Sequence, residues 1–281
     1  MRTQAEKGQI FRELHTRPGL LLLPNPWDAG TAKLLQSLGF EALATTSLGM
    51  SNALGRVDGD NAVSRDELLQ NCRVIAGATD LPVNADLENG YADDPKEAAT
   101  ILRDAAAVGI VGGSIEDWSG ERIYDFNHAV ERVVAGVEMA RSLPVPFTFV
   151  ARAENLIRGR PDLDDTIKRL QAFEKAGADV LYAPGLHSLA EIKTVTSALK
   201  KPFNLVMGFA DPTLTVEQLS AAGVKRISVG GALSRVAIAA FLRCAREMKD
   251  KGSFTFVPEM VTIQELRGAF AAGRPSANAT A

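Results

Sequence analysis

The repetition of one pattern constrains the fold of this chain more than any other feature. Short β-rich runs alternate with longer stretches whose apolar residues recur at i, i+3 and i+4, the spacing of one helix face. Such alternation favours parallel strands, and eight repeats favour closure into a barrel. The predicted strands are LLLLP (20–24), EALATTS (41–47), LPVNADL (81–87), GGSIED (112–117), FTFVARA (147–153), DVLYAP (179–184), FNLVMG (203–208) and RISVGG (226–231).

Glycines mark the expected ends of several helices, where a left-handed residue stops the helix before the next strand. They lie in SLGF (37–40), VGI (108–110), KAGAD (175–179) and AAGVKR (221–226). A doubly wound open sheet is the alternative because it is also built from βαβ units. However, no GxGxxG follows the first predicted strand to favour a dinucleotide fold. We therefore predict an α/β protein with a (β/α)8 TIM barrel.

The length of the chain suits one large barrel without a second domain. We predict that residues 1–281 form a single (β/α)8-barrel domain, with residues 247–281 as a C-terminal extension. This extension contains the helical pattern VTIQELRGAFAAG (261–273), which we expect to pack outside the barrel or against a partner. The tail RPSANATA (274–281) is small and polar, so we expect it to be loose.

Charge and composition exclude several classes of partner. The formal net charge of −3 leaves no basic surplus for a nucleic-acid backbone. No apolar run reaches the roughly 18 residues needed to cross a bilayer, and the start of the chain lacks the apolar core of a secretory signal. Cys72 and Cys244 lie in helical patterns, which is typical of reduced thiols. We expect a cytoplasmic protein that binds neither nucleic acid nor membranes.

Acidic residues follow neighbouring predicted strands at the edge where barrels carry their catalytic groups. Asp86, Glu88 and Glu116 gather there, and a cluster of buried carboxylates needs a cation or protons to offset its repulsion. Mg²⁺ suits this set because it binds carboxylate oxygens and retains several waters. The alternative is that each acid caps the N-terminus of a helix.

Arg152 directly follows the run FTFVA, so we expect it to face the mouth of the barrel, where its guanidinium could hold a carboxylate through two hydrogen bonds. Pairing with Glu154 or Glu116 as a structural strut is the alternative. The pair Gly230-Gly231 resembles a phosphate-binding turn of flavin or sugar-phosphate enzymes, or is simply a tight turn.

Two other barrel chemistries are disfavoured. A Schiff-base aldolase needs a lysine at the end of a strand, and none stands there. The three histidines, His15, His128 and His187, form no HExxH motif, which argues against zinc hydrolysis.

Five motifs in series resemble the isocitrate lyase and phosphoenolpyruvate mutase superfamily. They occur in the order and at the separations of that family, and the likeness runs from about residue 8 to about residue 245. The motifs are PNPWDAGTAKLLQSLGFEALATTSLGMS (24–51), GRVDGD (55–60), NADLENGY (84–91), SIED (114–117) and FVARAEN (149–155).

The resemblance implies a substrate pocket at the ends of the strands. Backbone groups of Ser47, Leu48 and Gly49 would bind the substrate carboxylate, and Trp27 and Asn204 would line the pocket. The family likeness also implies that the last helix of each barrel is swapped onto a partner. The expected assembly is a homotetramer built as a dimer of dimers.

The resemblance further implies a metal site beside this pocket. The ion would be Mg²⁺, with Mn²⁺ as the alternative, and its ligands, direct or through water, would be Asp58, Asp86, Glu88 and Glu116. Arg152 would hold the carboxylate and the 2-oxo oxygen of the substrate. The family pattern Asp-Ala-Asp-x-Gly reads DLENG here, so the second acid is one methylene longer.

The segment after the fourth strand departs further from the family. It reads EDWSGERIYDFNHAVERV (116–133), without the Lys-Lys-Cys-Gly-His motif of isocitrate and methylisocitrate lyases or the Lys- and Asn-rich loop of the mutase. Arg122, Tyr124, Asn127 and His128 could close over the substrate, with Tyr124 or His128 as the proton donor. The alternative is that this segment only begins the fourth helix, with Asp125 as N-cap.

We predict from these residues a Mg²⁺-dependent lyase-type enzyme that cleaves or forms a C–C bond of a small 2-oxo or 2-hydroxy carboxylate through an enolate. The predicted catalytic residues are Arg152, Glu116, Tyr124 and His128. A phosphonate enzyme acting on a C–P bond and a carboxylate-binding barrel without turnover are the alternatives. Release of phosphorus separates the phosphonate enzyme from the lyase, and Mg²⁺-dependent enolate chemistry separates both from the binding protein.

Overall fold

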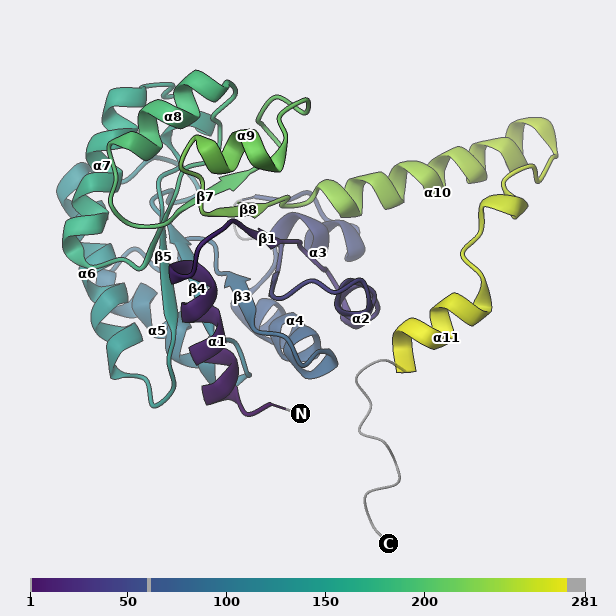
Figure 1. Ribbon diagram of the computed structural model, residues 1–281, viewed down its shortest axis with the longest axis horizontal. Coiled ribbons are helices and arrows are strands. Elements are labelled where there is room, and N and C mark those ends of the chain that lie inside the picture. The colour runs from purple at the N-terminus through teal and green to yellow at the C-terminus, as the bar shows by residue number, and fades with distance from the viewer. Residues whose placement is uncertain (1, 60–61, 272–281) are drawn as a thin grey trace, which may run out of the picture.

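The strands form one parallel eight-stranded barrel surrounded by helices (Figure 1). The computed structural model describes residues 2–59 and 62–271. Each predicted strand overlaps one observed strand, which confirms the TIM-barrel prediction. The strands are β1 (Leu21–Leu23), β2 (Leu43–Ala44), β3 (Val83–Asp86), β4 (Gly112–Glu116), β5 (Thr148–Arg152), β6 (Val180–Tyr182), β7 (Phe203–Val206) and β8 (Arg226–Ser228).

The α-helices follow the strands in the order expected of a β/α barrel, with α1 preceding the first strand. They are α1 (Gln4–Thr16), α2 (Ala29–Ser37), α3 (Ser47–Ala53), α4 (Arg65–Ala78), α5 (Pro95–Ala107), α6 (Phe126–Ser142), α7 (Leu163–Ala176), α8 (Leu189–Ser197), α9 (Val216–Ala221), α10 (Ala232–Lys251) and α11 (Ile263–Ala271). Two 3-10 turns, η1 (Asn155–Ile157) and η2 (Val257–Glu259), complete the described elements.

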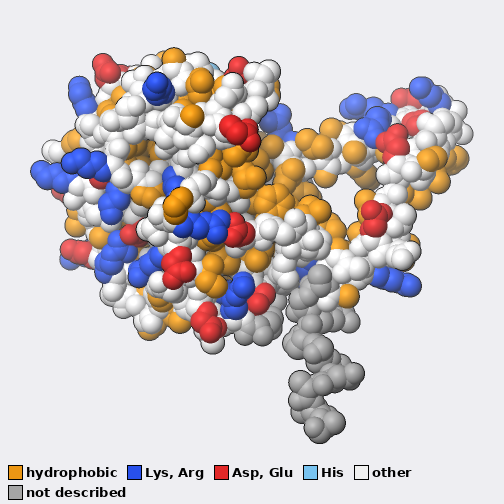
Figure 2. Space-filling model, viewed as in Figure 1, with side chains coloured by type: hydrophobic (Ala, Val, Ile, Leu, Met, Phe, Trp, Pro, Cys, Tyr) orange, Lys and Arg blue, Asp and Glu red, His pale blue; other side chains and the backbone are white. Residues whose placement is uncertain are grey.

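Helix α10 departs from the barrel instead of packing beside α9 (Figure 1). Apart from a contact with α3 it projects away from the other helices, and α11 returns to contact α2. We call residues 232–271, which run from α10 to α11, the arm. Figure 2 shows hydrophobic side chains along this arm and on the barrel face at its base. Val236 and Phe241 of α10 are 67% and 70% exposed, and Leu22 in the middle of β1 is 41% exposed. The tail at 274–281, expected to be loose, lies outside the described residues.

The seam between β1 and β2 is closed by hydrogen bonds from the strand ends. Ala44 N donates to Pro24 O at 3.0 Å. Asn25 Nδ2 donates to Thr45 O at 2.9 Å, and Asn25 Oδ1 accepts from the amides of Val229 and Gly230, each at 2.9 Å. One buried amide side chain therefore ties the residues after β1, β2 and β8 together at the mouth of the barrel.

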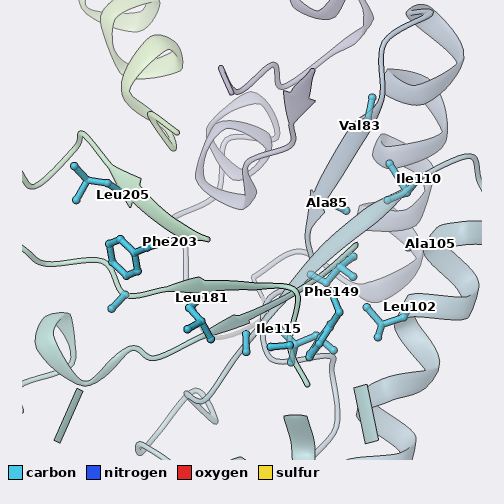
Figure 3. Packing of buried hydrophobic residues seen from close by; sticks show 14 of the residues in the cluster. Val83, Ala85, Leu102, Ala105, Ile110, Ile115, Phe149, Leu181, Phe203 and Leu205 are labelled. Carbon is cyan, nitrogen blue, oxygen red and sulfur yellow. The ribbon is translucent and has the colours of Figure 1, made fainter. Parts of the chain in front are cut away.

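The main core lies between the outer face of the strands and the helices (Figure 3). Alternate strand residues point outward into this layer, as the two-residue period of a strand requires. Phe149 of β5 packs so closely on α6 that a Cβ added at Gly136 would lie 2.5 Å from its ring. The labelled residues in Figure 3 are Val83, Ala85, Leu102, Ala105, Ile110, Ile115, Phe149, Leu181, Phe203 and Leu205.

The helix-ending glycines adopt the predicted conformation. Gly39, Gly109, Gly177 and Gly223 have φ values of 84°, 100°, 105° and 86°, a region that favours glycine. Each stands just before a buried strand, so the chain can reverse without a strained side chain. The four predicted joints are therefore confirmed.

The amino-terminal end of the barrel is covered by α1. Phe11 and Leu14 of this helix pack with Leu21, Leu23 and other residues in a second buried cluster that closes this end. Cys72 is buried in α4 and Cys244 is partly exposed in α10, and both are free thiols. Among the described residues, no helix is both long and apolar enough to cross a membrane.

Candidate active site

The carboxyl ends of the strands surround a cavity of about 300 Å³. Its lining comes from segments distant in sequence, because the ends of parallel barrel strands meet at one edge. Seven of the residues predicted for substrate or metal binding lie on its wall: Ser47, Leu48, Asp58, Asp86, Glu88, Glu116 and Arg152.

Arg152 lies between acids from neighbouring strands. Its Nη1 atom is 3.3 Å from Glu116 Oε2 and 3.6 Å from Asp86 Oδ1. Asp86 also faces the N-terminus of α3, where Ser47 N and Ser47 Oγ lie 3.4 Å and 3.2 Å from Asp86 Oδ2. The two carboxylates therefore share one guanidinium, and Asp86 is further oriented by the segment after β2.

The carboxylates of the cavity repel one another. Burial, together with the charges of Asp86 and Asp58, raises the pKa of Glu88 to about 8. Burial and the neighbouring Glu154 raise the pKa of Glu116 well above its usual value. Burial and Asp86 also raise the pKa of Asp58. These carboxyl groups therefore tend to hold protons when no other cation is bound, and an additional cation would favour their ionised forms.

Glu154 connects the cavity to a buried network behind it. This side chain is fully buried, accepts a hydrogen bond from Arg152 Nε and accepts another from Arg158 Nε at 3.1 Å. Its backbone amide donates to Asp117 Oδ1 at 2.8 Å, and Asp117 Oδ2 accepts from Arg169 at 2.9 Å. Arg152 and Arg158 are therefore held by one carboxylate whose own position is fixed by Asp117.

The donor chemistry of the cavity fits a hard divalent cation. All four predicted ligands carry carboxylate oxygens and line the cavity, and Mg²⁺ is commonly bound through one or two carboxylates with waters completing its shell. Within the described residues, no three His, Cys, Asp or Glu side chains converge as a complete ligand set. The arrangement therefore suits an ion held partly through water and substrate oxygens rather than a closed protein cage.

Three residues predicted for substrate binding do not line the cavity. Gly49 is buried, and its amide donates to Thr46 Oγ1 at 3.3 Å as part of the N-cap of α3. Trp27 packs beside Gly49, and its carbonyl accepts from Asn71 at 2.9 Å. Asn204 is fully buried below the cavity, where its Nδ2 donates to Ser228 Oγ at 3.1 Å. Their roles in binding remain predictions.

The segment after β4 is folded against the barrel rather than extended over the cavity. Trp118 and Ile123 form a β-bridge, and Ser119 N donates to Arg122 O at 2.9 Å. Asp125 occupies the N-cap position of α6, as the structural alternative expected, but its side chain makes no capping hydrogen bond.

The two predicted proton donors in this segment face Asp93. Tyr124 is buried and its hydroxyl donates to Asp93 Oδ1, while His128 Nε2 lies 3.0 Å from the Asp93 carbonyl. Burial and this carboxylate raise the pKa of Tyr124 to about 12. Neither side chain lines the cavity, so in the described conformation neither is placed to protonate a bound molecule.

The cavity also contains residues that the sequence patterns did not single out. Arg158 enters from the turn after β5, Tyr182 from the end of β6 and Arg235 from the first turn of α10. The ring of Tyr182 lies 4.9 Å from the Arg152 guanidinium carbon. The pair Gly230-Gly231 was noted in the sequence and lines the cavity at the N-terminus of α10.

Comparison with known proteins supports the resemblance read from the motifs. The family model described as phosphoenolpyruvate phosphomutase matches residues 11–249. An uncharacterised protein of Mycobacterium tuberculosis is 30% identical over 259 residues, covering 92% of this chain and 94% of that protein.

Solved structures show the same architecture. A crystal structure of a Burkholderia cenocepacia protein, provisionally described as a lyase/mutase, is 51% identical, with a TM-score of 0.92 over 96% of this chain and 97% of that chain. The fold is also that of phosphonopyruvate hydrolase solved with oxalate and Mg²⁺, with 22% identity and a TM-score of 0.80 over 93% of this chain and 95% of that chain.

The family model covers most of the barrel, and the 30% identical relative spans nearly the whole chain. Family members include lyases and mutases that act on small carboxylates. This chain therefore belongs to the phosphoenolpyruvate mutase and isocitrate lyase superfamily.

Proposed function

We propose that the cavity is the active site of a Mg²⁺-dependent lyase that makes or breaks a C–C bond of a small 2-oxo or 2-hydroxy carboxylate. The observation that carries this proposal is the position of Arg152 between Glu116 and Asp86 in a cavity with further carboxylates at Asp58 and Glu88. Such a set suits a substrate with adjacent oxygens, because the cation and the guanidinium can share them.

The side chains of the cavity have distinct roles in this proposal. Asp58, Asp86, Glu88 and Glu116 would hold Mg²⁺, directly or through water, with Mn²⁺ as a substitute. Bound there, the ion would supply a Lewis acid for the substrate carboxylate and 2-oxo oxygen. Arg152 would donate hydrogen bonds to the oxygen that gains negative charge as the bond to C3 breaks, stabilising the enolate. Its position is fixed in advance, because Glu154 holds its Nε atom.

An NMR time course tests this function directly. Purified protein with Mg²⁺ is incubated with oxaloacetate, phosphonopyruvate, phosphoenolpyruvate and branched 2-hydroxy diacids, beside samples that contain EDTA. We expect one carboxylate to lose or gain a C–C bond, with turnover abolished by EDTA and restored by added Mg²⁺. Turnover that continues in EDTA would contradict the proposal, as would a lack of turnover across a widened panel by a protein that binds Mg²⁺.

A phosphonate enzyme is the second candidate, favoured by one observation. Gly230, Gly231 and Arg235 bring the N-terminus of a long helix and a cation to the wall of the same cavity, and both features suit a phosphonate group. The same time course followed by ³¹P NMR separates the candidates. Release or migration of phosphorus from phosphonopyruvate would replace the lyase assignment with a C–P enzyme.

We also propose that the arm packs on further copies of this chain to form a homotetramer. The exposed apolar residues of α10 and the exposed outer face of β1 leave a large hydrophobic surface, which monomeric proteins rarely retain. Light scattering after size-exclusion chromatography should give the mass of a tetramer for the wild type and a smaller species for Phe241→Asp. A monomeric wild type would contradict this assembly.

A further inference from the structure

Arg158 is held at the wall of the cavity by two neighbours. It directly follows η1, and its Nε atom donates to Glu154 Oε2 at 3.1 Å. Its guanidinium carbon lies 4.8 Å from the centre of the Trp118 ring, in cation–π contact. Trp118 belongs to the folded segment after β4, which therefore positions an arginine at the cavity although its own Tyr124 and His128 face elsewhere.

The outer nitrogens of Arg158 lack a hydrogen-bond partner among residues 2–59 and 62–271. The acid oxygen recorded nearest to them is Glu116 Oε1, which is 3.8 Å from Nη2 and too distant for a hydrogen bond. A guanidinium carries five N–H donors, and Glu154 takes only the one on Nε. Four donors thus remain for a molecule bound in the cavity.

Arg152 and Arg158 are placed differently in the cavity, which Arg235 also lines. Arg152 Nη1 faces Glu116 and Asp86, so this arginine serves the side of the cavity where the proposed metal ligands gather. Arg158 approaches Glu116 only at longer range and has Trp118 beneath it. Because the two oxygens of Glu154 each hold one arginine, the spacing between the two guanidinium groups is fixed.

Resting on the proposed function, we infer that Arg158 binds a second anionic group of the substrate, distant from the end held by Arg152 and the metal. A planar guanidinium with free outer nitrogens can take a carboxylate through two parallel hydrogen bonds. Arg158 is then a specificity-determining residue that selects small acids with an anionic group at each end over matched acids with only one. Glu154 and Trp118 act as its positioning residues.

Matched ligands test this assignment. Lactate and malate both carry a 2-hydroxy carboxylate, but only malate has a second carboxylate, and oxalate has no group beyond the chelating pair. Calorimetric titrations at saturating Mg²⁺ should show that Arg158→Gln weakens the better-binding malate enantiomer by about 10- to 100-fold, the effect of losing a charge-assisted hydrogen bond. The affinities for lactate and oxalate should change by less than about threefold, a range too small to reflect such a bond.

Arg160→Gln is the matched control, because it removes the same charge two residues away, at an exposed site that pairs with Asp165 outside the cavity. This variant should bind all three ligands like the wild type. Arg158→Lys keeps the charge without the planar fork, so it should retain part of the preference for malate. It also provides the test if the glutamine variant fails to fold.

The outcomes distinguish this inference from the proposed function beneath it. An equal loss of affinity for malate, lactate and oxalate in Arg158→Gln would show that Arg158 acts only through Glu116 and Glu154, and would overturn the inference alone. An unchanged affinity for malate would also overturn it. If oxalate does not bind the wild type in the presence of Mg²⁺, the proposed function fails and the inference fails with it.

Discussion

The two ends of the barrel bury charge in opposite ways. At the carboxyl end, acids outnumber the arginines that contact them, and a cavity admits solvent and ligands. At the amino end, Arg226 is 2% exposed and has only neutral partners among the described residues: Asn204 Oδ1 at 2.7 Å from Nε, and His15 Nε2 at 3.5 Å from Nη1. One end has excess negative charge that a cation can neutralise, and the other has a cation enclosed by the fold.

The difference indicates which end serves chemistry and which serves stability. Repulsion among the cavity acids destabilises the free protein, and a bound cation relieves this repulsion, so the relief contributes to the affinity for the cation. Arg226 is buried beside His15 of α1, and burial lowers the pKa of Arg226 to about 9. Substitutions at the carboxyl end should therefore change activity, and substitutions at the amino end should change the free energy of unfolding.

The largest effect is expected at Asp86. Asp86→Asn removes a charge that faces both Arg152 and the N-terminus of α3, so turnover should fall by about 10²- to 10³-fold, the size seen when one preorganised electrostatic group is lost. Initial rates on the substrate found by NMR measure this effect. The metal-free variant should melt no lower than the wild type because one repelling charge is gone. The exposed Asp164 provides the control, and Asp164→Asn should leave the rate unchanged. A fully active Asp86→Asn would show that the acids of the carboxyl end do not serve the reaction.

Asn204 lies between the two ends and contacts Arg226, so its substitution should affect stability more than activity. Asn204→Leu leaves Arg226 Nε without its acceptor, so the free energy of unfolding should fall by about 1.5–3 kcal/mol, the usual contribution of a hydrogen bond to a charged group. Chemical denaturation measures the loss. Because Asn204 does not line the cavity, KM should change by less than about threefold, a range far below the effect of losing a polar substrate contact. A large rise in KM with unchanged stability would instead support the predicted role in substrate binding.

The amino end should also make stability depend on pH through His15. Burial and the charge of Arg226 lower the pKa of His15 from 6.5 to about 3. Below pH 6.5 the unfolded chain takes up a proton that the folded protein refuses, so stability falls with decreasing pH by about 1.4 kcal/mol per unit. Between pH 6.5 and pH 5 the wild type should lose roughly 2 kcal/mol of unfolding free energy through His15, and His15→Asn should lack this loss. Unfolding curves at the two pH values measure the difference. The exposed His187 serves as the control, and an unchanged pH dependence in His15→Asn would contradict the prediction.

The smallest effect is expected at Tyr124. Tyr124→Phe removes the hydrogen bond to Asp93, so stability should fall by about 1 kcal/mol. With the hydroxyl outside the cavity, kcat should remain within about threefold of the wild type, because general acid catalysis contributes 10²-fold or more. Steady-state rates measure kcat. A loss of kcat of about 100-fold would show that this segment rearranges and brings Tyr124 to the substrate.

The sequence could predict the strands, their turns and most of the acids because these depend on local patterns. Apolar runs indicate the strands, glycines with positive φ end the helices, and Asp86 and Glu116 stand where two strands end. Their convergence then follows from the closure of any parallel barrel.

Other positions depend on geometry that local patterns do not encode. Asn204 was predicted to line the substrate pocket. Its position along the barrel axis depends on the stagger between β7 and its neighbours, and this stagger places Asn204 below the cavity. Arg158 was missed because it stands beyond the strand end, and only η1 and the Trp118 ring bring it back to the wall. The hydrogen bond from Tyr124 to Asp93 could not be predicted, because Asp93 lies in a loop distant in sequence.

Calorimetry of oxalate binding to the wild-type protein, with and without Mg²⁺, would show whether the cavity holds a metal and a carboxylate ligand together. Oxalate presents the adjacent oxygens of an enolised 2-oxo acid without a bond to break. If Arg152 and a metal held by the cavity acids share these oxygens, oxalate should bind at least 100-fold more tightly with Mg²⁺, about 2.7 kcal/mol of coupling. Equal affinities in Mg²⁺ and in EDTA would contradict the account, because the acids of the carboxyl end would then have no part in holding the substrate.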